Sequence, residues 1–392
     1  MADDDHIEAL QAMVPASVRA LLGETFIASC GLIAQYTTCL ATRVFEELGL
    51  ARLCDGQFRS VASLVSSANL MSQADVPVKW LMETLAANGL VERRVDADGT
   101  PEFRASSDWA PMDSRPLLHE QERLDNRCLA AYTIAALAAE RYPAVLRGEV
   151  TGETALFGPD TFDAWCAYFS NDNPLYAISN AIGAVVVAEQ LTGEGNALLE
   201  MGGGLGSGAQ AVWERLAQEG RTNCVASYRF TEISGMFLRR AQKSLRPAFP
   251  EAPFSFAKLD IDRPFAEADV EPASCTLIYG VNVLHVAHDL AATLSEIRNA
   301  LAANGTLVIS ECVRPFADQP IYVEFVFNLL GAFRAPVLVP AWRPNGGFLT
   351  PEQWRAALEA NGFKNVRFLP DVTRIRDRIP AFVAAGIAAE RA

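Results

Sequence analysis

A run of glycines directly after a short apolar segment limits most strongly what this chain of 392 residues can fold into. The segment 197–201 reads as a strand, and the sequence continues as Glu200-Met-Gly-Gly-Gly-Leu-Gly-Ser-Gly208, with five glycines in seven residues. Glycine allows the backbone to turn sharply and to approach a ligand closely at the carboxyl edge of a sheet. A turn that only joins a strand to a helix rarely needs so many glycines, so we expect a ligand-binding loop.

Short apolar strands alternate with amphipathic helices from residue 195 onwards. The strands are expected at 197–201, 226–233, 254–259, 275–281 and 305–311. The helices are expected near 207–219, 234–245 and 289–302. Such alternation predicts an α/β fold, a Rossmann-like parallel sheet with helices on both faces.

The acid before the glycines distinguishes between two kinds of cofactor. Glu200 stands two residues before Gly202, in a Glu-x-Gly-x-Gly-x-Gly spacing that continues through Gly204 and Gly206. A carboxylate there would repel a pyrophosphate, but it can meet the cationic methionine portion of S-adenosylmethionine. We therefore expect S-adenosylmethionine rather than a dinucleotide.

Acids also follow the next two expected strands. Glu232 ends the second strand, where a carboxylate can accept hydrogen bonds from both ribose hydroxyls. Asp260 follows the third, where it can accept from the adenine amino group while Ile261 packs on the ring. Each acid alone could lie in a surface loop. Because the carboxyl ends of parallel strands meet at one edge, the three acids are expected to converge beside the glycine loop.

The first 110 residues are expected to form a domain of their own. Two helices are predicted within residues 6–50, and a third starts at Asp75-Val-Pro77 and ends near Gly89. Residues 90–104 predict a hairpin. Helices followed by a hairpin describe a winged helix, and its place before a catalytic domain resembles small-molecule O-methyltransferases, which commonly dimerise through it. The resemblance implies a homodimer.

A winged helix can also bind DNA, but the charges argue against nucleic acid. The helix that would enter the groove offers only Lys79 and also carries Glu83, and the net charge of the chain is −14. Phosphate binding needs a basic surface. We therefore assign residues 1–110 to dimerisation, residues 111–190 to a mostly helical lid or linker, and residues 191–392 to the catalytic domain.

Hydropathy and the start of the chain predict the location. No stretch of 18 residues is apolar enough for a membrane helix. Residues Met1–His6 are acidic where a signal peptide would be basic. We expect a cytoplasmic protein without a membrane partner.

Several segments of the chain resemble the C-methyltransferase domains of polyketide synthases. They are Tyr228-Arg-Phe-Thr-Glu-Ile-Ser234, Leu259-Asp-Ile-Asp262, Ile278-Tyr-Gly-Val-Asn-Val-Leu-His285, Gly305-Thr-Leu-Val-Ile-Ser-Glu311 and Phe348-Leu-Thr-Pro-Glu-Gln-Trp354 with Gly362-Phe363. Upstream, Leu156-Phe157 and Leu175-Tyr-Ala-Ile-Ser-Asn180 resemble the helical lid of that family.

The resemblance covers about residues 150–365 and implies a seven-stranded methyltransferase sheet. It adds Tyr176, Asn180 and Asn282 to the expected cofactor-binding residues. The family usually has Asp where this chain has Glu232, and its domains lie inside giant chains. The resemblance implies a small-molecule substrate, either free or bound to a carrier.

One histidine stands where methyl transfer would need a base. An acceptor C–H or O–H must lose a proton, and imidazole changes protonation near neutral pH. His285 closes the fourth expected strand, and Glu311 closes the fifth, where its carboxylate can hold the imidazole. In the resembled family these positions form a catalytic His–Glu pair. The alternative is that His285 only ends a strand and Glu311 faces solvent.

A second histidine nearby raises the question of a metal. His288 lies three residues after His285, but no further histidine is close in the sequence. Asp289 or Glu311 would have to complete the ligand set. We expect no metal, because His288 and Asp289 are better explained as the start of the next helix.

The stretch expected to cover the acceptor contains arginines and aromatic residues. Arg314, Arg334 or Arg343 could pair with a substrate carboxylate or phosphate, and Trp342 could wall an apolar pocket. Solvated arginines and ordinary core packing are the alternatives.

These observations predict an S-adenosylmethionine-dependent methyltransferase that methylates a carbon atom of a natural-product intermediate. An oxygen acceptor is the alternative that the winged helix favours. A regulator with a vestigial cofactor fold is a third possibility, and the intact glycine loop argues against it.

Overall fold

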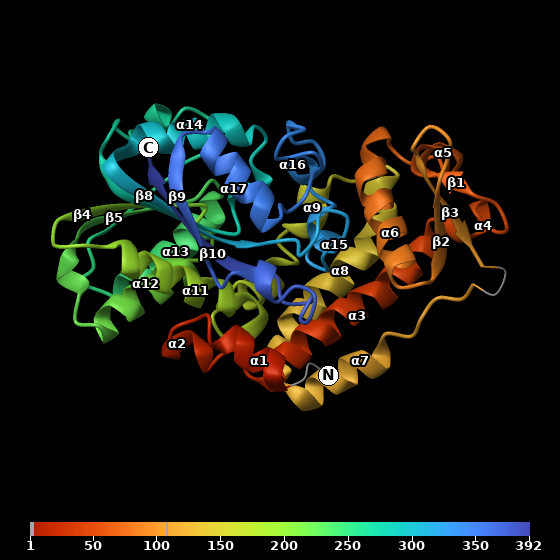
Figure 1. The fold of residues 1–392 in the computed structure, drawn as a ribbon, viewed down its shortest axis with the longest axis horizontal. Helices are drawn as coiled ribbons and strands as arrows, with labels where there is room; N and C mark the ends of the chain where they lie inside the picture. The colour runs from red at the N-terminus through yellow and green to blue at the C-terminus, as the bar shows by residue number, and fades with distance from the viewer. Residues whose placement is uncertain (1–3, 107–108) are drawn as a thin grey trace. The chain divides into compact units, whose positions relative to one another are not determined.

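The computed structural model describes residues 4–106 and 109–392 (Figure 1). The chain folds into two compact units, which we call the sheet unit and the helical unit. The sheet unit comprises Met1–Ile27, Phe169–Pro315 and Pro336–Ala392. The helical unit comprises Ala28–Tyr168 and Phe316–Ala335. Met1–Asp3, which hold part of the acidic terminus, lie outside the described residues.

Seven strands form the sheet of the first unit. They are β4 (Asn196–Met201), β5 (Val225–Thr231), β6 (Phe254–Ala257), β7 (Cys275–Val281), β8 (Leu301–Cys312), β9 (Phe363–Leu369) and β10 (Ala384–Arg391). Their order is β6-β5-β4-β7-β8-β10-β9. Strands β4 to β8 pair in parallel, whereas β10 is antiparallel to β8 and β9. The α/β class and the seven-stranded sheet are thus confirmed.

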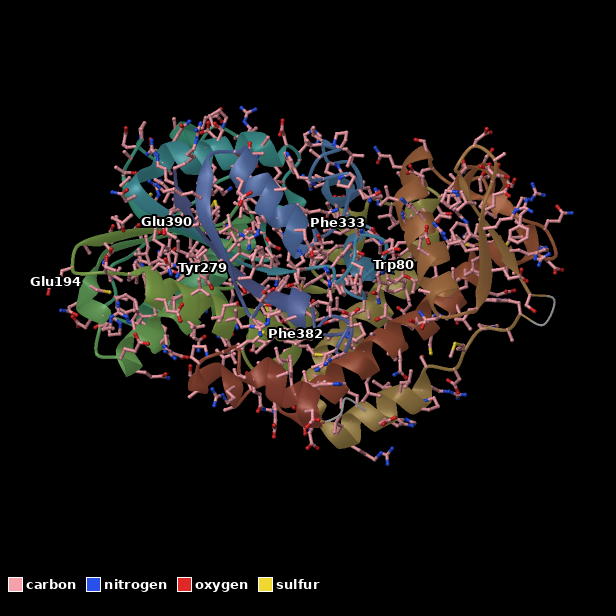
Figure 2. All side chains as sticks on the ribbon, viewed as in Figure 1. Trp80, Glu194, Tyr279, Phe333, Phe382 and Glu390 are labelled. Carbon is pink, nitrogen blue, oxygen red and sulfur yellow. The ribbon has the colours of Figure 1, made fainter. Side chains whose placement is uncertain are left out.

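Helices cover both faces of this sheet (Figure 1). On one face lie α11 (Pro174–Gln190), α12 (Ser207–Gln218) and α13 (Gly235–Ala248), which share one apolar core with the strands. On the other lie α14 (Leu290–Ala300) and α17 (Pro351–Ala360). The packing under α11 is tight, because a Cβ added at Gly183 would lie 2.5 Å from the hydroxyl of Tyr279, which Figure 2 labels.

The start of the chain differs from the expected pair of helices. It forms α1 (Asp4–Gln11), α2 (Ala16–Arg19) and α3 (Glu24–Glu47). Pro15, in an extended conformation, precedes α2 and has no backbone N–H to continue α1, so the first helix divides in two.

The helical unit also contains a small antiparallel sheet. Its strands are β1 (Arg59–Ser60), β2 (Val91–Val95) and β3 (Pro101–Ala105), in the order β1-β3-β2. The predicted hairpin is therefore present, and the predicted helix before it is α6 (Asp75–Ala87). The other helices are α4 (Leu50–Leu53), α5 (Val61–Ser67), α7 (Arg115–Leu124), α8 (Leu129–Leu146), α9 (Gly152–Leu156), α10 (Phe162–Tyr168), α15 (Glu324–Phe327) and α16 (Gly331–Arg334).

The segment that follows β8 returns to the helical unit before α17 begins. Within that unit the Tyr142 hydroxyl donates to the Phe325 carbonyl at 2.6 Å, and Trp80 Nε1 donates to the Ile321 carbonyl at 3.2 Å.

The roles assigned to residues 1–110 and 111–190 remain predictions. Among the residues that the structure describes, no helix has the length and apolar character to cross a membrane.

Candidate active site

The glycine loop connects β4 to α12, and its first glycines have no space for a side chain. A Cβ at Gly202 would lie 2.4 Å from Cγ2 of Val283, and a Cβ at Gly203 would lie 2.3 Å from the Phe230 ring. The loop is therefore enclosed by β5 on one side and by the residues after β7 on the other. Only glycine fits at these two positions.

Gly204 is different, because a Cβ there would meet no protein atom within 4 Å. Its φ is +57°, in the left-handed region that favours glycine, and Gly206 follows at +91°. The backbone N–H of Gly204 donates to Oε2 of Glu232 at 2.9 Å. The loop thus presents a bare backbone surface while a strand-end carboxylate holds it in place.

Glu200 is buried at the end of β4, underneath the start of α12. Its Oε2 accepts a hydrogen bond from the Tyr228 hydroxyl at 3.0 Å, and its Oε1 would lie 2.9 Å from a Cβ at Gly208. Burial raises the pKa of Glu200 to about 8, although the hydrogen bond from Tyr228 acts in the opposite direction. A cationic group beside this carboxyl would stabilise its charged form.

Asn180 of α11 contributes a second buried polar group at the same place. Its Nδ2 donates to Asn171 Oδ1 at 2.8 Å, whereas its own Oδ1 is buried without a hydrogen-bond partner. That oxygen would lie 3.7 Å from a Cβ at Gly208, the glycine that also abuts Glu200. A buried acceptor without a donor beside a buried acid fits the ammonium end of S-adenosylmethionine.

The raised pKa of Glu200 predicts that cofactor affinity depends on pH. Below about pH 8 the free protein carries a protonated Glu200, so binding a cation there releases a proton. The affinity for S-adenosylhomocysteine, which keeps the ammonium group, should rise by up to about tenfold per pH unit from pH 6 to 8 and then level off. Calorimetry across this range measures it. Glu200→Gln should bind more weakly, with a flat profile; an equal slope in that variant would contradict the assignment.

Glu232, at the end of β5, is buried and bound to the backbone on both sides. Its Oε1 accepts from Ser234 N at 2.8 Å, and its Oε2 accepts from Gly204. Burial raises its pKa, and these backbone hydrogen bonds oppose that rise. The next residue, Ile233, was not predicted as part of the site, yet its side chain is 58% exposed. In the sequence, only its position directly after Glu232 could have indicated that an apolar side chain lies next to this carboxylate.

The residues expected at the adenine follow β6. Asp260 Oδ1 accepts from the backbone N–H of Asp262 at 3.0 Å, within a turn. Ile261 lines a cavity of about 300 Å³, together with the residues after it and the start of α14. The remaining lining residues are Asp262, Arg263, Pro264, His288, Asp289, Ala292, Thr293, Ser295 and Glu296. Asp260 does not line this cavity, although Ile261 does.

The two remaining residues expected at the cofactor come from α11 and from the end of β7. Burial raises the pKa of the Tyr176 hydroxyl, and the Tyr176 ring lies 5.1 Å from that of Phe169. Asn282 has a φ of +49°, which asparagine tolerates better than most residues. Its Oδ1 accepts from Cys312 N at 2.8 Å, so it joins the ends of β7 and β8.

His285 and Glu311 form a buried pair at the ends of these two strands. His285 lies in the short turn Leu284–Val286, and its ring is 1% exposed. The distance between His285 Nδ1 and Glu311 Oε2 is 2.7 Å. The other carboxylate oxygen, Oε1, accepts from the N–H groups of Val283 at 3.0 Å and Leu284 at 2.8 Å. One carboxylate therefore holds both the ring and the turn that carries it.

This arrangement determines which imidazole nitrogen can act as a base. With Glu311 as a carboxylate, which only accepts hydrogen bonds, Nδ1 carries the proton toward Glu311 and Nε2 carries the lone pair. The Phe348 ring, which was not predicted as a site residue, packs on the imidazole with 4.1 Å between ring centres. Hydrogen bonds and packing thus fix the plane of the ring.

The four residues expected at the acceptor have different surroundings. Arg343 is buried and donates to the carbonyls of His285 and Ala287, and Trp342 is buried beside it in the chain. Arg314 Nη2 donates to the Gly346 carbonyl at 3.5 Å. Arg334 lies in the helical unit, where its Nη1 donates to the carbonyls of residues 328 and 329.

Comparison with known proteins also points to a methyltransferase. Residues 181–367 match a family model described as a methyltransferase domain. The polyketide synthase PksR of Bacillus subtilis (strain 168) is 24% identical over 253 residues, which cover 63% of this chain and 10% of that protein. The chain therefore spans about a tenth of the length of this curated relative.

Two solved structures share the fold across almost the whole chain. The CurJ carbon methyltransferase aligns with a TM-score of 0.79 at 21% identity and covers 100% of both chains. The trans-methyltransferase CalH, solved in complex with SAH, aligns with a TM-score of 0.62 at 19% identity and covers 92% of this chain and 90% of its own. Residues 181–367 therefore match the methyltransferase family model, and the chain shares its fold with the CurJ carbon methyltransferase.

Proposed function

We propose that the chain transfers the methyl group of S-adenosylmethionine to a carbon atom of a polyketide-type intermediate, with His285 as the general base. The buried His285–Glu311 pair carries this proposal, because a carbon acceptor must lose a proton and the pair offers a base in a fixed orientation. The polyketide synthase among the relatives supports the substrate class. The acceptor would be a small acyl compound, free or bound to a carrier.

Cofactor binding is assigned to the carboxyl edge of the sheet. When bound, S-adenosylmethionine supplies a methyl group on a positively charged sulfur. Glu200 and Asn180 would meet its ammonium end, Glu232 its ribose, and Ile261 its adenine. The complete set is Tyr176, Asn180, Glu200, Gly202, Gly204, Gly206, Glu232, Asp260, Ile261 and Asn282.

The residues of the chain supply alignment and proton removal. Glu311 holds the imidazole so that Nε2 faces away from the carboxylate, and Nε2 takes the proton from the acceptor carbon. Glu311 then stabilises the imidazolium that forms. Because the ring is almost completely buried, this proton transfer takes place away from bulk water.

Transfer of an isotope-labelled methyl group tests the acceptor atom. We expect NMR of the product made with ¹³C-labelled cofactor to show a methyl group bonded to carbon, stable to mild ester or ether cleavage. Loss of the label on that treatment would favour an oxygen acceptor, the alternative suggested by the helix and hairpin at residues 75–105. Absence of cofactor binding in calorimetry would favour a regulatory protein instead.

We also propose that residues 1–110 are a winged-helix domain that forms a homodimer. Val95, on β2, is an exposed apolar residue within this range. Light scattering coupled to size-exclusion chromatography at micromolar protein should give twice the chain mass of 42.5 kDa. A single-chain mass under these conditions would count against dimerisation.

A further inference from the structure

A short segment of the sheet unit, residues 337–343, binds the backbone that carries His285; we call it the strap. The N–H of Val337 donates to the His288 carbonyl at 2.7 Å. Arg343 Nη1 donates to the Ala287 carbonyl at 2.7 Å, and its Nη2 donates to the His285 carbonyl at 2.9 Å. The strap thus binds three of the four carbonyls between residues 285 and 288.

The strap is a turn closed by backbone hydrogen bonds, which fix the position of the Arg343 backbone. Val339 N donates to the Arg343 carbonyl at 3.0 Å, and Arg343 N donates to the Val339 carbonyl at 2.7 Å. Trp342, between them in the chain, is buried. The guanidinium extends from this anchored backbone to the turn at His285.

Burying the Arg343 side chain at this position costs free energy. Its side chain is 1% exposed, and its Nε is buried without a hydrogen-bond partner. Burial lowers its pKa to about 10, whereas the nearby charges of Asp262, Asp289 and Glu311 act in the opposite direction. A guanidinium that is buried to bind carbonyl groups costs free energy in desolvation, and an apolar side chain would avoid that cost. A positional role for the planar pair of donors accounts for its presence.

Glu311 alone does not fix the direction of the imidazole. It binds the N–H groups at the start of the turn and one ring nitrogen, but the carbonyls at the end of the turn need their own donors. Arg343 supplies two of them, including the one for His285 itself. The turn is therefore held from its amide side by a carboxylate and from its carbonyl side by a guanidinium.

We propose that Arg343 is a positioning residue, which fixes the backbone of His285 and thereby the direction of Nε2 toward the acceptor. This inference rests on the proposed function of His285. It replaces substrate binding as the proposed role of Arg343, because the side chain is 1% exposed and its guanidinium donates to the protein backbone.

Arg343→Lys tests the role, since lysine keeps the charge but cannot reproduce the planar pair of donors. We expect kcat to fall roughly 10²-fold, the cost of a small misplacement of a catalytic group, with the cofactor Kd unchanged. Arg343→Met removes both donors and should lose at least as much. If Arg343→Met does not fold, the lysine variant decides, with its circular dichroism and Tm as the check on folding.

A double variant separates positioning from general damage. In a His285→Ala background there is no imidazole to direct, so adding Arg343→Lys should change single-turnover rates by less than about twofold. A further fall in the double variant comparable to that in the wild-type background would overturn the positioning role. Full activity of His285→Ala by itself would instead overturn the proposed function.

Arg221 offers a matched control in the same unit. Its Nη1 donates to the Ala188 carbonyl and its Nη2 to the Leu191 carbonyl, and it precedes β5, at the opposite edge of the sheet from the site. Arg221 also pairs with Glu219, and its side chain is 37% exposed. Arg221→Lys thus loses two hydrogen bonds to backbone carbonyls away from the site and should leave kcat within about twofold of wild type. A kcat loss equal to that of Arg343→Lys would show that any such substitution impairs the enzyme, and would overturn the assignment.

Discussion

Replacing His285 by alanine should reduce turnover by roughly 10²–10⁴-fold, the usual contribution of a general base. The ring is buried, and its Nδ1 lies 2.7 Å from the Glu311 carboxylate. A water molecule in the alanine variant would therefore not replace the imidazole as an oriented base. The affinity for S-adenosylmethionine should change by less than about twofold, because Glu200, Glu232 and the glycine loop do not depend on the imidazole. Single-turnover rates with saturating acceptor, together with calorimetry, measure both.

An acceptor that needs no base provides the control for this variant. A sulfur nucleophile, or a carbon acid acidic enough to be ionised in solution, requires only alignment with the methyl group. If the variant methylates such a compound at the wild-type rate and fails with an ordinary acceptor, the imidazole acts on the proton. Near-full turnover with the ordinary acceptor would mean that another residue is the base.

Glu311→Gln tests the same pair through the imidazole tautomer. Oε1 of Glu311 accepts from two backbone N–H groups, so the amide oxygen of glutamine must take that place and its NH₂ group must face Nδ1. Nδ1 then becomes an acceptor, and the proton moves to Nε2, where the base was. Turnover should fall about as far as in His285→Ala, roughly 10²-fold or more, and ¹⁵N NMR should show the proton on Nε2. An unchanged tautomer with normal turnover would contradict the pair.

The parts of the fold with local signals could be predicted from the sequence. The glycine run, the acids at 200 and 232 and the apolar strands around them are all encoded within a few neighbouring residues. The observed strand limits differ from the predicted ones by a few residues: β8 begins at Leu301, not at 305, and β6 ends at Ala257, not at 259. Such limits depend on pairing with neighbouring strands, which no local pattern specifies.

One strand and one division of the chain had no local signal. Strand β10 reads Ala-Ala-Gly-Ile-Ala-Ala-Glu-Arg, with a single β-branched residue and without the alternation typical of a half-exposed strand, because it is covered on both faces and paired on both edges. Residues 316–335 belong to the helical unit although the sheet unit contains both flanking segments. That assignment depends on contacts with residues more than a hundred positions away.

The partners of Arg343 and Asn180 could not be predicted either. Arg343 binds carbonyls 56 and 58 residues earlier in the chain, and its sequence neighbours give no indication that it is buried. The resemblance named Asn180, but only the structure shows its unpartnered oxygen near Glu200. Sequence patterns predicted that Glu200 and Glu232 lie beside the glycine loop, whereas burial and hydrogen bonding determine what each of these residues can do.

Replacing Gly204 by valine should lower cofactor affinity by roughly 10²-fold or more, equivalent to about 2.8 kcal/mol. A Cβ there would meet no protein atom within 4 Å, so the new side chain would extend into the space above the loop that the proposal gives to the cofactor. The same substitution would strain a backbone with a φ of +57° and disturb the hydrogen bond to Glu232. Calorimetric titration with S-adenosylhomocysteine measures the affinity, and Tm measures the strain.

Gly220 separates these two effects, because it also has a positive φ, +67°, and a Cβ there would also meet no atom within 4 Å. It lies just after α12, at the end of that helix away from the glycine loop. Gly220→Val should therefore lose stability like Gly204→Val, about 1–2 kcal/mol from backbone strain, while it binds the cofactor normally. Equal affinities in the two variants would show that the space above Gly204 is not where the cofactor lies. Loss of binding confined to Gly204→Val, at equal stability, would locate the cofactor at the bare backbone of the loop.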